Sequence, residues 1–279
     1  MLFRSYPYRK FRKPRLGMPL NKGHRLSKGL VGCWLMNEGC GTTNADVSGN
    51  GNIGTISSAT WSAGKFGSCL SFDGDGDYVD LGAKDFVGNR YSLSISGWFY
   101  VPSGEGTPSY RFFSQRYGGG NIYTVDVYWY NPYTTNLFRF VVRNSSDTLA
   151  YADGPATAKP TPGKWNHFVG VYDGINATCY INTIAGTPVA LAGPTKSGSV
   201  SSMIGALAST TPANFWNGFI DNVMVYNRAL SAAEIAKLYI EPFCMFEPTI
   251  SPVFGSYYIP PVGNIGIMTT WGGYWGVTY

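Results

Sequence analysis

The stretch from Lys164 to Asn182, KWNHFVGVYDGINATCYIN, decides the fold. In its first half Trp165 and Val169 fall on one side of an extended ribbon, and Phe168 falls on the other. The turn-forming pair Asp173-Gly174 then interrupts the run before apolar residues resume, which indicates a β-hairpin. Both faces of the ribbon carry large side chains. We therefore expect the hairpin to lie inside a two-layer β-structure.

The rest of the chain supports an all-β protein. Of its 279 residues 16% are aromatic and only 13% are charged, which is typical of a turn-rich β-fold with one sizeable core. One helix is predicted, because Ser231 and Glu234 form a capping box ahead of an apolar stripe. Further strands are expected at 68–72, 78–81, 91–101, 122–130, 137–143, 148–151, 188–192, 200–205 and 219–226.

Three parts are predicted from composition. Residues 1–28 hold nine basic residues and no acid, so they form a basic extended arm, whereas the remainder has 12 basic against 16 acidic residues. Residues 29–241 form the β-sandwich. Residues 242–279 are rich in aromatic residues, Gly and Pro and have Glu247 as their single charge, which predicts an extended tail lying along its own domain or a partner.

The body resembles a known family. The stretches GLVGCWLMNEGCG, GKFGSCLSFDGDGDYVDLG, SLSISGWFY, GKWNHFVGVYDG and GFIDNVMVYNRALSAAEIAKLY lie in order between Gly29 and Tyr239. They are similar to the laminin-G-like, concanavalin A-like jelly rolls of the lectin and glucanase superfamily. The resemblance implies a two-sheet antiparallel jelly-roll sandwich with one concave sheet and a short helix after the last strand.

A second resemblance concerns the ends of the body. The segments MPLNKGHRLSKGLVGCW and EPFCMFEP look like those flanking such domains in bacteriophage and prophage virion proteins. This implies a non-enzymatic virion structural protein, either a capsid decoration protein or one associated with a tail or fibre. Residues 1–28 and 242–279 would then contact other virion proteins, and a homo-oligomer is expected. The alternative is a carbohydrate-binding module that recognises a glycan at a cell surface or outside the cell.

Other functions are less favoured. A glycoside hydrolase needs two flanking carboxylates, but the five glutamates are scattered and no Glu-x-Asp-x-Glu run exists. A GxSxG elbow is also missing, so we expect no enzyme. The basic arm is compatible with an anionic surface, with nucleic acid as the less favoured partner, or with solvent. No apolar run is long enough to span a membrane.

Two sets of acidic residues are candidate calcium ligands. Asp73, Asp75 and Asp77 cluster in one turn, although Tyr78 stands where an EF-hand requires Gly. The alternative for this turn is a set of exposed carboxylates screened by solvent. The family resemblance implies a structural calcium at Asp221, assisted by Asp46 or a nearby carbonyl group. The alternative for Asp221 is a hydrogen-bonded carboxylate at a strand end.

A glycan site is predicted at consecutive aromatic residues. Tyr128, Trp129 and Tyr130 lie within an aromatic-rich stretch and could provide platforms for sugar rings. Packing in the core or an interface is the alternative for these side chains. The five cysteines lack CxxC spacing, so buried reduced thiols are expected, with a Cys33–Cys40 bridge as the alternative.

Overall fold

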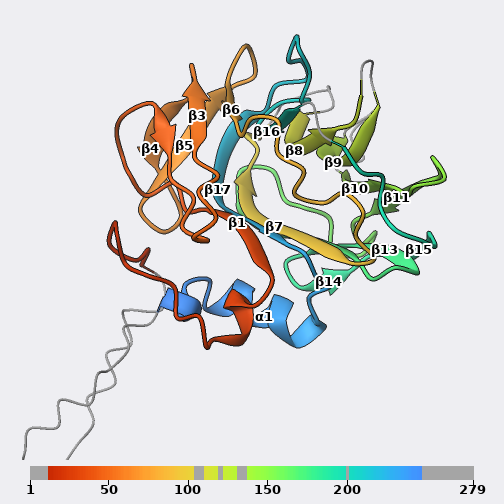
Figure 1. Ribbon diagram of the computed structural model, residues 1–279. Coiled ribbons are helices and arrows are strands. Elements are labelled where there is room, and N and C mark those ends of the chain that lie inside the picture. The colour runs from red at the N-terminus through yellow and green to blue at the C-terminus, as the bar shows by residue number, and fades with distance from the viewer. Residues whose placement is uncertain (1–11, 104–109, 119–121, 131–136, 199–200, 247–279) are drawn as a thin grey trace, which may run out of the picture. The chain divides into compact units, whose positions relative to one another are not determined.

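The computed structural model describes residues 12–103, 110–118, 122–130, 137–198 and 201–246. It shows two stacked antiparallel sheets, as predicted (Figure 1). Sheet A has the order β14-β13-β12-β7-β17-β5-β4, with β1 also on β17 and β15 also on β13. Sheet B has the order β11-β10-β9-β8-β16-β6-β3-β2. The fold is therefore a jelly-roll sandwich.

The elements have the following bounds. Strands β1 to β9 are Leu30–Trp34, Thr43–Asn44, Gly54–Ser57, Thr60–Ala63, Ser68–Asp73, Tyr78–Asp80, Leu93–Tyr100, Tyr110–Arg116 and Tyr123–Tyr130. Strands β10 to β17 are Leu137–Arg143, Leu149–Asp153, Trp165–Tyr172, Asn176–Ile181, Ile184–Ala185, Val189–Ala190, Ser201–Ile204 and Asn217–Tyr226. The helices are η2 (Arg25–Ser27), α1 (Ala232–Ile240) and η4 (Cys244–Phe246).

The predicted hairpin is confirmed as β12 and β13. Phe168 pairs with Ile181 and Tyr172 pairs with Ala177, so Asp173-Gly174 forms the turn. Strand β12 also pairs along its whole length with β7, which places it inside sheet A. Its side chains are buried on both faces, because one face meets sheet B and the other packs in a second apolar cluster with α1, η2 and η4.

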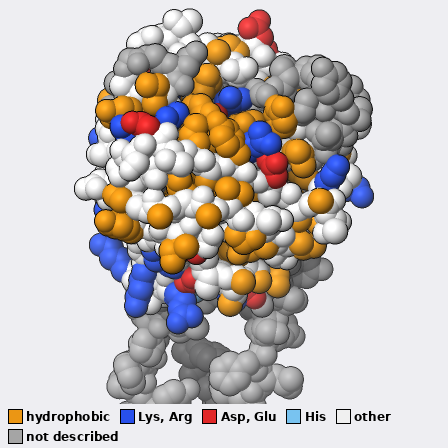
Figure 2. All heavy atoms as spheres, turned by 90° about the vertical axis from the view of Figure 1, so that its right-hand side faces the viewer, with side chains coloured by type: hydrophobic (Ala, Val, Ile, Leu, Met, Phe, Trp, Pro, Cys, Tyr) orange, Lys and Arg blue, Asp and Glu red, His pale blue; other side chains and the backbone are white. Residues whose placement is uncertain are grey.

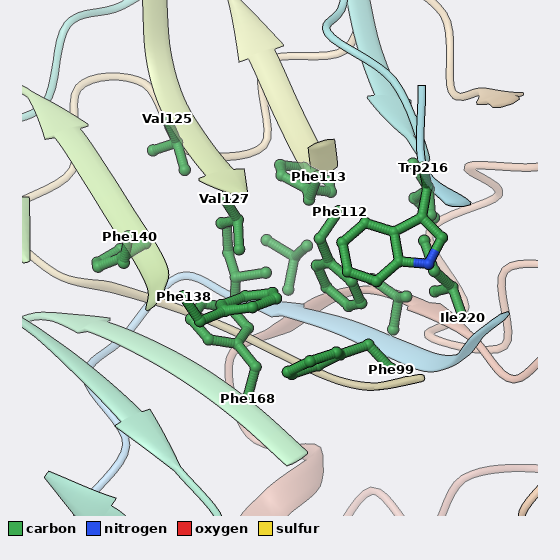
Figure 3. Close-up of a cluster of buried hydrophobic side chains, with 14 of the residues drawn as sticks. Phe99, Phe112, Phe113, Val125, Val127, Phe138, Phe140, Phe168, Trp216 and Ile220 are labelled. Carbon is green, nitrogen blue, oxygen red and sulfur yellow. The ribbon is translucent and has the colours of Figure 1, made fainter. Parts of the chain in front are cut away.

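The main core lies between the sheets and is built from aromatic rings (Figure 3). Phe99 of β7 stacks on Phe138 of β10 with ring centroids 4.3 Å apart, and Phe138 lies 4.8 Å from Phe168 of β12. Gly170 of β12 makes room for such rings, since a Cβ there would lie 2.5 Å from Phe140. The glycine is thus a packing requirement of the core.

A second apolar cluster covers the outer face of sheet A. Helix α1 has the predicted capping box, in which the Ser231 side chain accepts from Glu234 N and Glu234 bonds back to Ser231 N. Its buried face packs beside η2 and η4, and Leu26 of η2 is 1% exposed. Figure 1 shows the N-terminal ribbon passing beside α1 on this side of the molecule.

Parts of the predicted arm and tail therefore pack onto the body. Over residues 12–28 the chain contacts this second cluster, and Asn21 N donates to Met245 O at 2.9 Å. Residues 1–11 and 247–279 of the predicted arm and tail lie outside the described residues.

The five cysteines are free thiols. Cys33, Cys69, Cys179 and Cys244 are buried, as expected, and Cys40 is exposed. Burial raises the pKa of the Cys33 and Cys179 thiols well above its usual value, which keeps them protonated and unreactive.

Candidate functional site

The outer face of sheet B carries a group of neighbouring Arg and Tyr side chains centred on Arg139 of β10. This Arg–Tyr array consists of Arg111, Tyr128, Tyr130, Arg139 and Tyr151. Arg139 lies opposite Tyr128 of β9 and Asp153 of β11 in the strand register. Its guanidinium carbon is 4.7 Å from the ring centroid of Tyr130 and 5.6 Å from that of Tyr151. Because successive side chains of a strand point to opposite faces, these residues share the face turned away from the core.

A bidentate ion pair fixes the centre of this array. Arg139 donates from Nε to Asp153 Oδ1 at 2.5 Å and from Nη2 to Oδ2 at 2.9 Å. The hydrogen bond to Asp153 is the main cause that raises the pKa of Arg139 above its usual value. The Asp153 side chain keeps 37% of its surface exposed and that of Arg139 keeps 20%. The pair thus holds polar groups rigidly at the surface of the sheet.

An open depression of ≈ 510 Å³ adjoins the pair at the edge of sheet B. Tyr151 and Asp153 belong to both features, so the depression continues the Arg–Tyr array. Its other walls include Leu137, Pro155, Thr157 and Thr187. Figure 2 views the side of the molecule on which the β10, β11 and β13 labels of Figure 1 lie. Hydrophobic side chains gather there, with Lys, Arg, Asp and Glu side chains between them.

The array extends to β8 through a buried acidic residue. Asp126 is fully buried, and its Oδ2 lies 2.8 Å from Arg111 Nε. Burial raises the pKa of Asp126 to about 6, and Arg111 opposes this shift. The Arg111 guanidinium also lies 4.1 Å from the ring centroid of Tyr128. These contacts hold Tyr128 in place beside the more exposed Arg139.

The structure divides the three aromatic residues that were predicted to bind a ligand. Tyr128 and Tyr130 lie on the outer face, with their ring centroids 6.1 Å apart. Tyr128 is buried at 7% exposure by its neighbours, so of these two predicted platforms only the half-buried Tyr130 is accessible. Trp129 points into the core, where it is 2% exposed and its ring lies 6.3 Å from Phe99. The prediction for Trp129 is therefore wrong, because consecutive strand residues cannot share a face.

The most accessible residues of the array were missed by the sequence reasoning. Tyr151 has 43% of its surface exposed, and it lies beside Arg139 and Asp153. The sequence does contain a pattern that could have indicated this face. In LFRFVVR of β10, Arg139 and Arg143 interrupt an apolar run at even spacing. Such spacing places both charges on one face of the strand.

The predicted acidic turn folds around its own backbone. Asp77 Oδ2 accepts from Asp73 N at 3.0 Å, and Asp73 Oδ1 accepts from Asp75 N at 2.8 Å. Burial is the main cause that raises the pKa of Asp77. Within the described ranges, no group of three or more His, Cys, Asp and Glu side chains is arranged to hold a metal ion. Calcium at this turn stays a prediction.

The other two predicted calcium ligands hold different partners. Asp46 accepts from Cys33 N at 2.9 Å, Ser48 N at 2.9 Å and Asn52 N at 3.0 Å, so it organises the loop after β1. Asp221 of β17 is fully buried and pairs with the ammonium group of Lys13. A calcium ion at Asp221 would have to displace Lys13. The residues present therefore do not fit an ion in this pocket as it is folded.

Comparison with known families identifies the fold. A model described as the "Concanavalin A-like lectin/glucanases superfamily" matches residues 73–236, more than half of the chain. The protein belongs to this superfamily. A search of curated protein sequences finds no match.

Solved structures share the fold at low identity. Domain 4 of the extracellular GH43 arabinanase AbnA from Geobacillus stearothermophilus, solved with arabinotriose, is 20% identical with a TM-score of 0.55. The match covers 75% of this chain and 98% of that domain.

Two longer proteins contain a similar domain. The binding domain of Paraclostridial Mosquitocidal Protein 1 is 14% identical with a TM-score of 0.60, and the match covers 79% of this chain and 54% of that one. The Trypanosoma rangeli sialidase in complex with sialic acid is 16% identical with a TM-score of 0.56, and the match covers 78% and 33%. This chain thus spans about half of the solved binding domain and a third of the solved sialidase chain.

Proposed function

We propose that the protein is a carbohydrate-binding domain whose site lies at Arg139, Tyr151 and Asp153 on the outer face of sheet B. One observation carries the proposal. An exposed aromatic ring, Tyr151, stands beside a rigid Arg139–Asp153 pair at the mouth of an open depression. Binding sites in proteins commonly combine an apolar wall with a few fixed polar groups in a hollow.

The chemistry of these groups suits a sugar. A pyranose or furanose ring has an apolar C–H face that can stack on the ring of Tyr151 or Tyr130, while its hydroxyl groups need polar partners. Asp153 can accept hydrogen bonds from hydroxyl groups, and the guanidinium of Arg139 can donate them. Because the ion pair is already formed, little conformational entropy is lost when a ligand binds.

The similarity of the fold to those of known proteins supports the proposal of carbohydrate binding. The AbnA domain was solved with arabinotriose, and the superfamily takes its description from lectins and glucanases. We propose binding without catalysis. Three described glutamates serve structural roles: Glu38 accepts from Ala45 N at 2.6 Å, Glu234 belongs to the capping box, and Glu241 pairs with Lys237. Glu105 and Glu247 lie outside the described residues.

A glycan array followed by isothermal titration calorimetry tests the proposal. The panel should include arabino-oligosaccharides and sialylated glycans, since similar folds were solved with arabinotriose and with sialic acid. We expect at least one ligand, with an affinity reduced about tenfold or more by Tyr151→Ala. Tyr91→Ala is the matched control, because Tyr91 is 67% exposed and lies outside the array. Absence of any ligand for the wild-type protein would contradict the proposal.

The setting in which this domain works remains a prediction. A virion structural role, with residues 1–28 and 242–279 contacting other virion proteins and with a homo-oligomer, is compatible with a displayed glycan-binding face. An extracellular or cell-surface location is the alternative. Among the described residues, no helix has both the length and the apolar character needed to cross a membrane. Cosedimentation of wild-type and truncated proteins with assembled particles would test the virion role.

A further inference from the structure

Lys13 is inserted into a buried pocket lined by oxygen atoms. Its Nζ donates to Met36 O at 3.0 Å, to Ser68 O and to Asp221 Oδ1. The Lys13 side chain is only 6% exposed and that of Asp221 is fully buried. The ammonium group has three N–H donors, so these three acceptors satisfy it completely. The contacts join residue 13 to three segments that are far apart in the sequence.

The backbone of the pocket is shaped to present oxygen atoms. Met36 has φ 53° and Asn222 has φ 53°, which are left-handed conformations that non-glycine residues seldom adopt. At Asn222 the pairing of β17 with β7 also shifts register, directly after Asp221. Such strained positions persist when the surrounding structure holds them. Both positions adjoin acceptors of Lys13, because Met36 supplies its own carbonyl group and Asn222 directly follows Asp221.

One oxygen of the pocket has no partner. Asp221 Oδ2 is buried and makes no hydrogen bond among the described residues. Three oxygen atoms therefore contact Lys13 Nζ, and Asp221 Oδ2 belongs to the same carboxylate as one of them. Carboxylate and carbonyl oxygens are the ligands that calcium prefers, and water often completes such a site. Without Lys13, the pocket would therefore have the ligand chemistry of a divalent cation site.

We propose that Lys13 is a built-in cation that takes the place of a divalent metal ion in the Asp221 pocket and thereby anchors the N-terminal segment to sheet A. Residues 12–28 are held to the body at one end by this contact and at the other by Leu26 and the Asn21–Met245 bond. Removing the ammonium should uncover a divalent cation site. This inference does not depend on the proposed carbohydrate binding.

Thermal unfolding of the full chain in EDTA and in millimolar CaCl2 tests the inference. The difference between the two wild-type melting temperatures gives the baseline response to calcium, which includes any ion bound at the turn of Asp73, Asp75 and Asp77. Lys13→Met leaves a buried carboxylate without a partner, so in EDTA it should melt roughly 6–15 °C lower. Calcium should then recover part of that loss, because the ion replaces the missing charge. Lys22→Met is the matched control, since Lys22 is exposed on the same segment.

A second variant keeps the test decisive if Lys13→Met folds poorly. In Lys13→Met with Asp221→Asn neither charge remains, so the melting temperature should recover much of the loss seen in Lys13→Met. Calcium should then stabilise the double variant no more than it stabilises the wild-type protein. The inference would be overturned if calcium raised the melting temperature of Lys13→Met no more than that of the wild-type protein, because removal of Lys13 would then have opened no cation site. The inference would also be overturned if Lys13→Met and Lys22→Met had the same melting temperature. The same holds if the melting temperature of Lys13→Met were lower but did not respond to calcium.

Discussion

Arg139 Nε and Nη2 donate to the two carboxylate oxygens of Asp153 at 2.5 and 2.9 Å, across the register pair that joins β10 to β11. This pair stands between the exposed ring of Tyr151 and the depression at the edge of sheet B. Because it orders two polar side chains before any ligand arrives, the binding proposal depends on its geometry as well as its charge.

Arg139→Lys tests the role of geometry. A lysine keeps the charge but loses the planar fork that bonds both oxygens of Asp153. We expect glycan affinity to fall by about 5- to 30-fold, since the loss corresponds to about 1–2 kcal/mol of ordered polar contact. Calorimetry measures this change, and Arg90→Lys is a control, because Arg90 lies outside the array. An unchanged affinity would show that the ligand does not use the pair.

Trp129→Ala and Tyr151→Ala should separate stability from binding. Trp129 is buried in the core, so its truncation should lower the free energy of unfolding by about 3–5 kcal/mol. Tyr151 is exposed, and its truncation should change that free energy by about 0.5 kcal/mol or less. Urea unfolding monitored by circular dichroism distinguishes them. Equal destabilisation by both changes would contradict the placement of these side chains on opposite faces.

His167 should make the protein sensitive to acid. Its Nε2 lies 3.0 Å from Ser96 Oγ, and burial lowers its pKa to about 3 from an ordinary value of 6.5. The unfolded chain therefore takes up a proton at higher pH than the folded one. Stability from this residue is complete above pH 6.5 and is lost as pH falls toward about 3.

The comparison with His167→Gln isolates this effect. Between pH 7 and pH 3.5 the wild-type free energy of unfolding should fall by about 3–4 kcal/mol more than that of the variant. Denaturant unfolding at several pH values measures the difference. If the two pH profiles run parallel, His167 is not held neutral in the core.

Even a single methyl group added at Gly170 should destabilise the protein. A Cβ at this position would lie 2.5 Å from Phe140 Cδ2, inside the packed core. Gly170→Ala is therefore expected to cost about 1–3 kcal/mol of stability. Adding Phe140→Leu should recover part of the loss, because a smaller side chain frees space. Gly23→Ala is a control at a surface position where the nearest atom belongs to a flexible side chain.

Local patterns predicted much of the fold. The alternation at Trp165–Tyr172 and the turn at Asp173-Gly174 identified the central hairpin, and Ser231 with Glu234 identified the only α-helix of the described part of the chain. These two predictions are confirmed because the residues that form each pattern lie close together in the sequence. The same alternation, applied strictly, would have separated Trp129 from its two tyrosine neighbours.

Contacts between distant segments escaped the sequence reasoning. Lys13 and Asp221 are 208 residues apart, and no local pattern links them. The Arg139–Asp153 pair required the register of β10 and β11, which depends on the whole sheet. The candidate site is therefore a property of strand pairing, whereas the hairpin and helix are properties of their own residues.

Calorimetric titration of the best array ligand into wild-type, Tyr151→Ala and Tyr91→Ala proteins tests the central claim most directly. The account predicts measurable binding to the wild-type protein, a loss of about tenfold or more for Tyr151→Ala, and no change for Tyr91→Ala. Full binding by a correctly folded Tyr151→Ala protein would contradict the assignment of the site to the outer face of sheet B.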